Sequence, residues 1–305
     1  MPPLRHLVPL LALATAACGP LGVPERVSVP GVDRVSGEVT TVEVELPGAD
    51  LAAVRGPAGI MVLGASLEGG RVQGGTSPEC ALRRNANGSL AARSTRCASL
   101  LGQYAALEKA RRFLLSAGAE SLLPAAVLAD SPGAEAGLRY LPASDAFTVT
   151  DGPTGARVPS GLNLGAVVRE MSRRQLRGLA EHHADEAEGI ALFLGAAAAR
   201  DPGYLALSEP SGDPTGERDL ARPVPSSRAS VLAGALWAWA DASGDLLAAS
   251  RAALAAARAL DRPAPAGPES VLSLVAAQLD GAERDQACAV FRARSIGAAA
   301  IPACP

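Results

Sequence analysis

The spacing of apolar residues predicts strands and one long helix in the first half of the chain. β-Branched and polar residues alternate over residues 38–46, and the apolar run GIMVLGASL begins at Gly59, so each stretch is expected to form a strand. Apolar residues then recur at helical spacing before Gly118, a natural helix stop, which predicts a helix over about residues 98–117. Residues 138–158 predict two short strands around a Gly/Pro turn.

The second half of the chain has a helical period almost throughout. From residue 163 onward the apolar residues follow the 3.6-residue repeat, with one interruption by a loop rich in Pro, Gly and Ser. We therefore expect an α+β fold, with a small β-containing N-terminal lobe over residues 38–162 and a mostly helical C-terminal lobe over residues 163–305. The expected helical segments are 164–179, 181–199, about 229–260 and 269–294, with the loop at 208–227.

Residues 1–17 have the pattern of a signal peptide. Two basic residues precede an apolar run, which is too short to cross a bilayer, and small residues lead up to Cys18. A cysteine after small residues resembles a bacterial lipobox, although Thr15 stands where Leu is more usual. We expect a lipid on Cys18 that holds the exported protein to a membrane of the cell envelope, and a Pro- and Gly-rich tether over residues 18–37. A plain secreted protein in which Cys18 is incidental is the alternative.

The four remaining cysteines form two pairs that are close in sequence. Cys80 lies near Cys97, and Cys288 lies near Cys304. In an oxidising compartment, local pairing is the favoured one of the three possible connectivities, so we expect one disulfide in each lobe. No CxxC spacing occurs, which argues against a metal site built from these cysteines.

Composition narrows the possible partners. The 305 residues are 48% hydrophobic and 19% charged, which is typical of a globular protein, and the net charge is −3. This charge gives no electrostatic reason to expect nucleic-acid binding.

The octapeptide VVREMSRR resembles the active-site helix of a zinc peptidase in which the metal ligands have been replaced. In such a helix two His one turn apart hold the metal, and the Glu after the first His is the general base for the metal-bound water. Arg169, Glu170 and Arg173 occupy those places here. A third carboxylate ligand commonly comes from a following helix, in an ExxxD pattern whose Asp orients a ligating His. Glu181 and Asp185 have this spacing.

Further motifs follow in the order found in thermolysin-like and fungalysin-like zinc metallopeptidases. They are YAALEKARRFLLSAG from Tyr104, SDAFTVTDGPTG from Ser144, GLAEHHAD from Gly178, GERDLARP from Gly216, SSRASVLAGALWAW from Ser226 and the closing stretch 269–297. The chain resembles this family from Leu100 to Gly297, through the shared order of weak motifs. The resemblance implies a β-containing lobe, a helical lobe and an active-site helix between them.

The departures from the family pattern imply that catalysis has been lost. Arg169 and Arg173 replace both histidine ligands, and Ser226 stands where the family places its transition-state histidine. Arginine is a permanent cation with donors only, so it cannot bind zinc, and we expect zinc and any other cofactor to be absent. Glu170 keeps the type of the base and the ExxxD acids keep theirs. The segment between Arg173 and Glu181 is, however, shorter than the family usually has.

Two arginines can occupy a former metal site because they supply the positive charge of the metal. Carboxylates buried together need a compensating charge, and two guanidinium groups supply the charge of a divalent cation. We therefore expect Arg169 and Arg173 to form an ion-pair cluster with Glu170 and Glu181. The simpler alternative is a solvated basic helix face.

Two other groups of residues are candidates for chemistry. His182 and His183 are neighbours on a helix and diverge by about 100°, so they cannot grip one metal as i, i+4 partners do. A displaced zinc site that joins one of them to Glu181 and Asp185 is the remaining route to metal binding. Two tryptophans in ALWAWA, Trp237 and Trp239, are expected in the core, with contact to a peptide or glycan as the alternative. No GxSxG, phosphate-binding loop or GxGxxG is present.

Three functions are compatible with the sequence. We favour an exported, lipid-anchored protein that keeps a peptidase fold without catalysis and binds a peptide or protein partner, or acts as a scaffold. An active metallopeptidase with a displaced metal site is the second. An unrelated helical envelope lipoprotein is the third.

Overall fold

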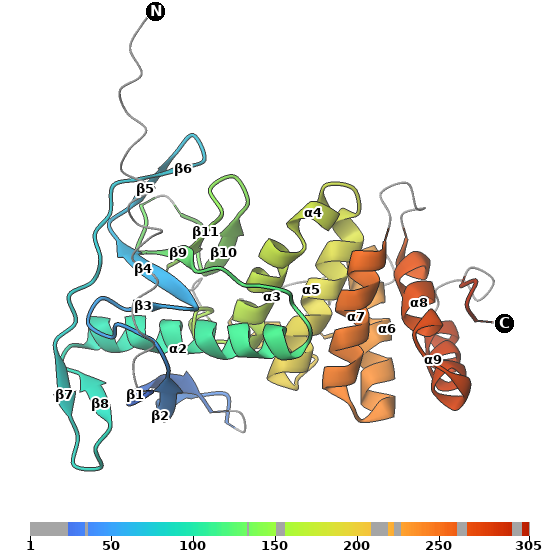
Figure 1. Ribbon diagram of the computed structural model, residues 1–305, viewed down its shortest axis with the longest axis horizontal. Coiled ribbons are helices and arrows are strands. Elements are labelled where there is room, and N and C mark those ends of the chain that lie inside the picture. Colours follow the sequence, from blue (N-terminus) through green and yellow to red (C-terminus); the bar gives the residue numbers. More distant parts are fainter. Residues whose placement is uncertain are drawn as a thin grey trace, which may run out of the picture.

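The computed structural model describes residues 24–33, 36–132, 134–150, 156–208, 219–222, 227–260, 267–294 and 301–304 (Figure 1). Strands and one long helix make up the first part of the chain, and helices follow one another in the second part, as expected for the α+β class. Within the described residues, no helix is long and apolar enough to cross a membrane.

The first sheet begins inside the stretch that was expected to be a tether. Strand β1 is fully paired with the antiparallel β2, and its residues Val27 and Ser28 also pair with the parallel β8. The tether prediction is therefore wrong for Glu25–Val32. Val27 and Val29 alternate with more exposed residues and are buried beside the long helix, and this burial outweighs the local effect of Pro30 and the following glycine. The sheet has the order β2-β1-β8-β7, from β1 (Glu25–Val32), β2 (Val39–Leu46), β7 (Leu82–Arg84) and β8 (Leu90–Ala92).

Helix α2 (Thr95–Ser116) is the long helix predicted for about residues 98–117. Ser94 caps its first turn by accepting the N–H of Cys97, and Gly118 follows its end with a φ of +95°. A disulfide between Cys97 and Cys80 ties the first turn to the chain before β7, which confirms the predicted pair.

The second sheet has β10 at one edge. Its strands β4, β9 and β11 are parallel, and β10 is antiparallel to β11. The two strands predicted within residues 138–158 are β10 and β11, joined by a turn at residues 142–145, and residues 151–155 lie outside the described chain. The sheet has the order β10-β11-β9-β4-β3, from β3 (Arg55–Gly56), β4 (Gly59–Leu63), β9 (Ala125–Ala129), β10 (Leu138–Leu141) and β11 (Ala146–Val149), and β5 (Ser66–Glu68) pairs with β6 (Arg71–Gln73) as a separate hairpin.

The helical part contains shorter helices than the periodicity predicted. The stretch expected at about 229–260 divides at Gly244, whose φ is +72°, and the stretch at 269–294 divides at residues 278–280. The helix expected at 164–179 also divides, at Leu176. The helices are α3 (Leu164–Gln175), α4 (Arg177–Ala180), α5 (Ala184–Ala199), the 3₁₀ helix η2 (Tyr204–Leu207), α6 (Arg228–Ser243), α7 (Leu246–Ala259), α8 (Pro268–Ala277) and α9 (Gly281–Ala293).

Glycines allow α3 and α5 to approach each other closely. A Cβ on Gly165 would lie 2.3 Å from the ring of Tyr204 and 2.9 Å from the carbonyl oxygen of Gly195, and a Cβ on Gly195 would meet the same ring. The two helices consequently pack side by side along their length, with the Tyr204 ring against both glycines. This packing positions the polar residues described below.

The second disulfide joins the last helix to the C-terminal segment. Cys288 in α9 is bonded to Cys304, again as the spacing predicted. Both sulfur atoms belong to buried residues, so the bridge fixes the C-terminal segment against the helical core.

Candidate functional site: an arginine–glutamate cluster between α3 and α5

Helix α3 carries Arg169, Glu170 and Arg173 and begins at a buried cap. The Oδ1 atom of Asn163 accepts the N–H groups of Gly165 and Ala166, at 3.1 and 3.4 Å. The Nδ2 atom of Asn163 donates to the backbone oxygen of Tyr204 at 2.7 Å and to Ser208 Oγ at 3.0 Å. The start of α3 is therefore fixed to the turn that follows α5.

Arg169 and Arg173 both bind a carboxylate from the neighbouring helix. Glu188 of α5 accepts from Arg169 through Nε at 2.9 Å and Nη2 at 2.6 Å, both to Oε1. It also accepts from Arg173, with Nε 2.6 Å from Oε2 and Nη2 2.8 Å from Oε1. The side chains of Arg169, Arg173 and Glu188 are 14%, 32% and 25% exposed, so the predicted alternative of a solvated basic face does not describe these arginines.

Glu170 uses both of its carboxylate oxygens inside the protein. Oε1 accepts from Arg173 Nη1 at 2.8 Å, and Oε2 accepts from the backbone N–H of Tyr140 in β10 at 2.8 Å. The side chain is 2% exposed. The N–H of Leu138, also on β10, donates to Ser160 Oγ at 2.6 Å, so side chains occupy two donors of this edge strand. Glu170 thus connects the cluster to the sheet.

The electrostatic state of Glu188 follows from its two partners. Burial by itself raises the pKa of the Glu188 carboxyl, but the charge of Arg169 and the hydrogen bonds and charge of Arg173 outweigh burial and hold the pKa below its ordinary value. Burial lowers the pKa of Arg169, but interactions with Glu188, Tyr204 and Glu170 together more than offset this and raise the pKa, so the guanidinium remains charged. The cluster consists of charged, mutually hydrogen-bonded groups.

A second ion pair holds the β10–β11 hairpin to α3. Asp145, in the turn with a φ of +47°, receives Arg174 in bidentate geometry, with both N···O distances 2.8 Å. The Tyr140 hydroxyl donates to the same carboxylate at 2.9 Å, and Arg177 lies 3.4 Å away. The bonds from Arg174 lower the pKa of Asp145, although partial burial raises it. This contact keeps Tyr140 N–H in reach of Glu170.

The structure corrects the expected position of the third acid. Glu181 is exposed, lies at the end of α4 and takes no part in the cluster, so the predicted contact with Arg169 and Arg173 is wrong. Glu188 takes this place because it lies on α5, one turn after that helix begins at Ala184, on the face packed against α3. Asp185 is exposed in the first turn of α5, and Ser226 lies outside the described residues.

The other candidate residues lie in different surroundings. His182 is exposed, whereas His183 is buried, with Nδ1 3.9 Å from Glu186 Oε2. Trp237 and Trp239 are buried in α6, as expected for core residues, and Trp239 packs edge-on against a phenylalanine of α9 with ring centroids 6.1 Å apart. Among the described residues, no three His, Cys, Asp or Glu side chains are grouped so that they could hold a metal ion.

The sequence did not single out Glu188, Tyr140, Asp145 or Arg174. Glu188 lies in the acidic run Asp185, Glu186, Glu188, which is typical of a solvated helix face, so nothing in the sequence indicated that Glu188 faces α3. The role of Tyr140 had no signal, since a backbone N–H belongs to every residue except proline. The Arg174–Asp145 pair spans 29 positions and depends on the hairpin reaching α3.

No protein-family model and no curated protein sequence matches this chain. The donor set does not fit zinc, because two of the groups that converge on Glu188 are guanidinium cations without a lone pair for a metal.

Proposed function

We propose that this protein is an exported, lipid-anchored, non-catalytic relative of thermolysin-like and fungalysin-like zinc metallopeptidases, with a binding or scaffolding role in the cell envelope. One observation carries the proposal: two side chains one turn apart on α3 converge on a carboxylate from a following helix. This is the arrangement that the resemblance implies for two histidine ligands and a third acidic ligand, with arginines in place of the histidines. The zinc charge would then be replaced by two fixed guanidinium charges.

The spacing of Glu188 supports the proposed family relationship, although Leu192 stands where the ExxxD pattern would place its Asp. Glu181 follows Arg173 too closely for the usual pattern, whereas Glu188 is 15 residues beyond Arg173. The longer spacing leaves room for the turn through α4 before the acid returns to α3.

The state of Glu170 supports the absence of hydrolysis. A general base needs a free oxygen within hydrogen-bond reach of the attacking water. Both oxygens of Glu170 are engaged, by Arg173 and by Tyr140 N–H, and arginine supplies no metal to activate water.

Export and anchoring rest on separate features. The signal-peptide pattern ends at Cys18, and two disulfides are present, as is common in oxidising compartments. We propose that lipid on Cys18 holds the protein to a membrane and that a peptide or another protein is its partner. Mass spectrometry of membrane fractions tests the anchor, since wild type should carry a diacyl modification on Cys18 and Cys18→Ala should be lipid-free.

Restoring the histidines tests the family relationship. Arg169→His with Arg173→His should create a site that takes up one zinc ion per chain, measured by elemental analysis, and Glu188→Ala in this background should abolish it. Wild type should contain no stoichiometric zinc and should not cleave peptides. Zinc and peptidase activity in wild type would favour the active enzyme with a displaced site. Failure of the double variant to bind zinc, with its fold intact by circular dichroism, would favour an unrelated helical lipoprotein.

A further inference from the structure

The two disulfides of the protein lie in different surroundings. Cys97 is half-buried in the first turn of the 22-residue helix α2, and this turn contains no acid. Cys288 lies in the middle of α9 instead, and both it and Cys304 are buried. Among the described cysteines, Cys97 is therefore the one whose sulfur atom lies at the start of a helix.

The surroundings of Cys97 favour a negatively charged sulfur atom. The first N–H groups of a helix carry a partial positive charge, and a thiolate near them is stabilised. Two exposed cations precede Cys97 closely in the sequence: Arg93, whose Nε donates to the backbone oxygen of Leu82 at 3.3 Å, and Arg96, which pairs with Asp130 at 3.3 Å. A sulfur atom that is stable as a thiolate leaves a disulfide faster.

A cavity gives access to the other sulfur atom of this bridge. Its volume is about 350 Å³, and its lining includes Cys80, Asp50 and Glu79 but not Cys97. In thiol–disulfide exchange the attacking, attacked and leaving sulfur atoms lie roughly in one line, so a thiolate in this cavity reaches Cys80 and displaces Cys97. Asp50 is already paired with Arg55 at 3.1 Å, whereas Glu79 is exposed beside Cys80. Its charge disfavours an anionic reductant.

We propose that Cys80–Cys97 is an exchangeable disulfide, which a neutral or cationic dithiol reduces while Cys288–Cys304 persists. One thiolate of the dithiol attacks Cys80 Sγ, the protein S–S bond breaks, and Cys97 Sγ keeps the electron pair. The second sulfur atom of the dithiol then attacks the mixed disulfide and releases Cys80. The dithiol is oxidised to its own disulfide, and its two protons end on the two protein thiols. The inference is independent of the proposed peptidase ancestry, because it uses no residue of α3 or α5.

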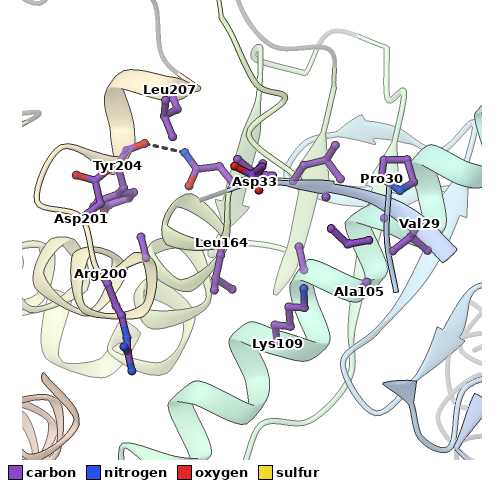
Figure 2. A pocket seen from close by; sticks show the side chains of 18 residues that line it. Val29, Pro30, Asp33, Ala105, Lys109, Leu164, Arg200, Asp201, Tyr204 and Leu207 are labelled. Atoms are coloured by element: carbon purple, nitrogen blue, oxygen red, sulfur yellow. Dashed lines mark hydrogen bonds between the residues drawn. The ribbon is translucent and has the colours of Figure 1, made fainter. Parts of the chain in front are cut away.

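Reduction of this bridge loosens the β7–β8 hairpin and leaves β1 in place. Two residue pairs join β8 to β1, at Val27 and Ser28. The rest of β1 is held by β2 and by α2, where Val29 and Pro30 lie beside Ala105 (Figure 2). Loss of the bridge therefore opens the edge of β1 that β8 covers, and such an edge can pair with another strand.

Graded reduction of the native full-length protein with dithiothreitol tests the proposal. Thiols are trapped with iodoacetamide and located by mass spectrometry of peptides. Cys80 and Cys97 should be alkylated at least about ten-fold faster than Cys288 and Cys304. Hydrogen exchange should then rise in residues 82–92 and stay unchanged in residues 281–293. Equal reduction of both bridges, faster reduction of Cys288–Cys304, or unchanged exchange in the hairpin would overturn the proposal.

Monothiols of different charge test the direction of attack. Cysteamine, a cationic thiol, should leave its adduct on Cys80, with Cys97 free for alkylation. At equal thiolate concentration it should react several-fold faster than the anionic 2-mercaptoethanesulfonate, and Glu79→Gln should narrow this difference. Glu68→Gln is the matched control, because Glu68 is exposed but lies outside the cavity lining, and it should leave the difference unchanged. An adduct mainly on Cys97, or equal effects of the two substitutions, would overturn the proposed attack through this cavity.

Discussion

Removing Glu188 should expose how strongly the arginine–glutamate cluster contributes to stability. In Glu188→Ala, Arg169 and Arg173 lose the carboxylate to which they make four hydrogen bonds of 2.6 to 2.9 Å. Breaking a buried ion pair by deleting one partner costs about 3 to 5 kcal/mol. Because Arg173 is 32% exposed and can gain water, we expect a loss near the lower limit, about 3 kcal/mol.

Urea denaturation followed by far-ultraviolet circular dichroism measures this loss of unfolding free energy, with the disulfides intact. In a separate thermal melt, at about 2 to 4 °C per kcal/mol for a chain of this size class, the melting temperature should fall by roughly 6 to 12 °C. Glu181→Ala is the internal control, because Glu181 is exposed on the same chain segment and its removal should change the unfolding free energy by less than about 0.5 kcal/mol. Equal effects of the two substitutions would refute the cluster as a stabilising element.

Replacing every charged member of the cluster tests whether the loss in Glu188→Ala comes from uncompensated charge. The quadruple variant Arg169→Met, Glu170→Gln, Arg173→Met, Glu188→Leu leaves no charge in the cluster, and the amide at position 170 keeps an acceptor for the N–H of Tyr140. It should therefore be more stable than Glu188→Ala, since apolar replacements of buried ion pairs are often neutral or stabilising. A quadruple variant less stable than the single variant would show that the penalty in Glu188→Ala does not come from uncompensated guanidinium charge.

Three further predictions concern other parts of the fold. The folded-state pKa of Glu188 lies below its unfolded value of about 4.3, so the stabilisation that the ionised carboxylate gives is present above that pH and is lost as the pH falls through the folded-state pKa. Below about pH 4 the free energy of unfolding of wild type should therefore fall more steeply than that of Glu188→Gln, as measured by urea titrations at each pH. Replacing both Cys80 and Cys97 with Ala should cost about 2 to 4 kcal/mol, because the bridge closes a loop of 17 residues, and an unchanged denaturation midpoint would contradict this. Gly165→Ala should lower stability by about 1 to 3 kcal/mol through its clash with Tyr204, whereas Gly178→Ala, with no neighbour within 4 Å of the new Cβ, should not; equal melting temperatures would contradict the close approach of α3 and α5.

Local sequence was sufficient for features that depend on neighbouring residues. The period of apolar residues located α2 and the helical second half, because one face of each helix must be buried wherever the helix lies. The short separations of Cys80 from Cys97 and of Cys288 from Cys304 were enough to predict both disulfides, since loop closure favours near partners. Strand β1 was missed because Pro30 and Gly31 obscured a short alternation that only the packing against α2 stabilises.

The motif also determined which charges would have to be neutralised, but not by which acid. Arg169 and Arg173 lie on one face of α3 by helical geometry alone, and a partner for them could be expected from the sequence. The choice of Glu188 over Glu181 depends on the turn through α4 and on the close glycine contact between α3 and α5, which set the rotation and height of one helix against the other. Such an alignment sums contacts that are distant along the chain. It therefore exists only in the tertiary structure, as do the contact of Tyr140 with Glu170 and the cavity beside Cys80.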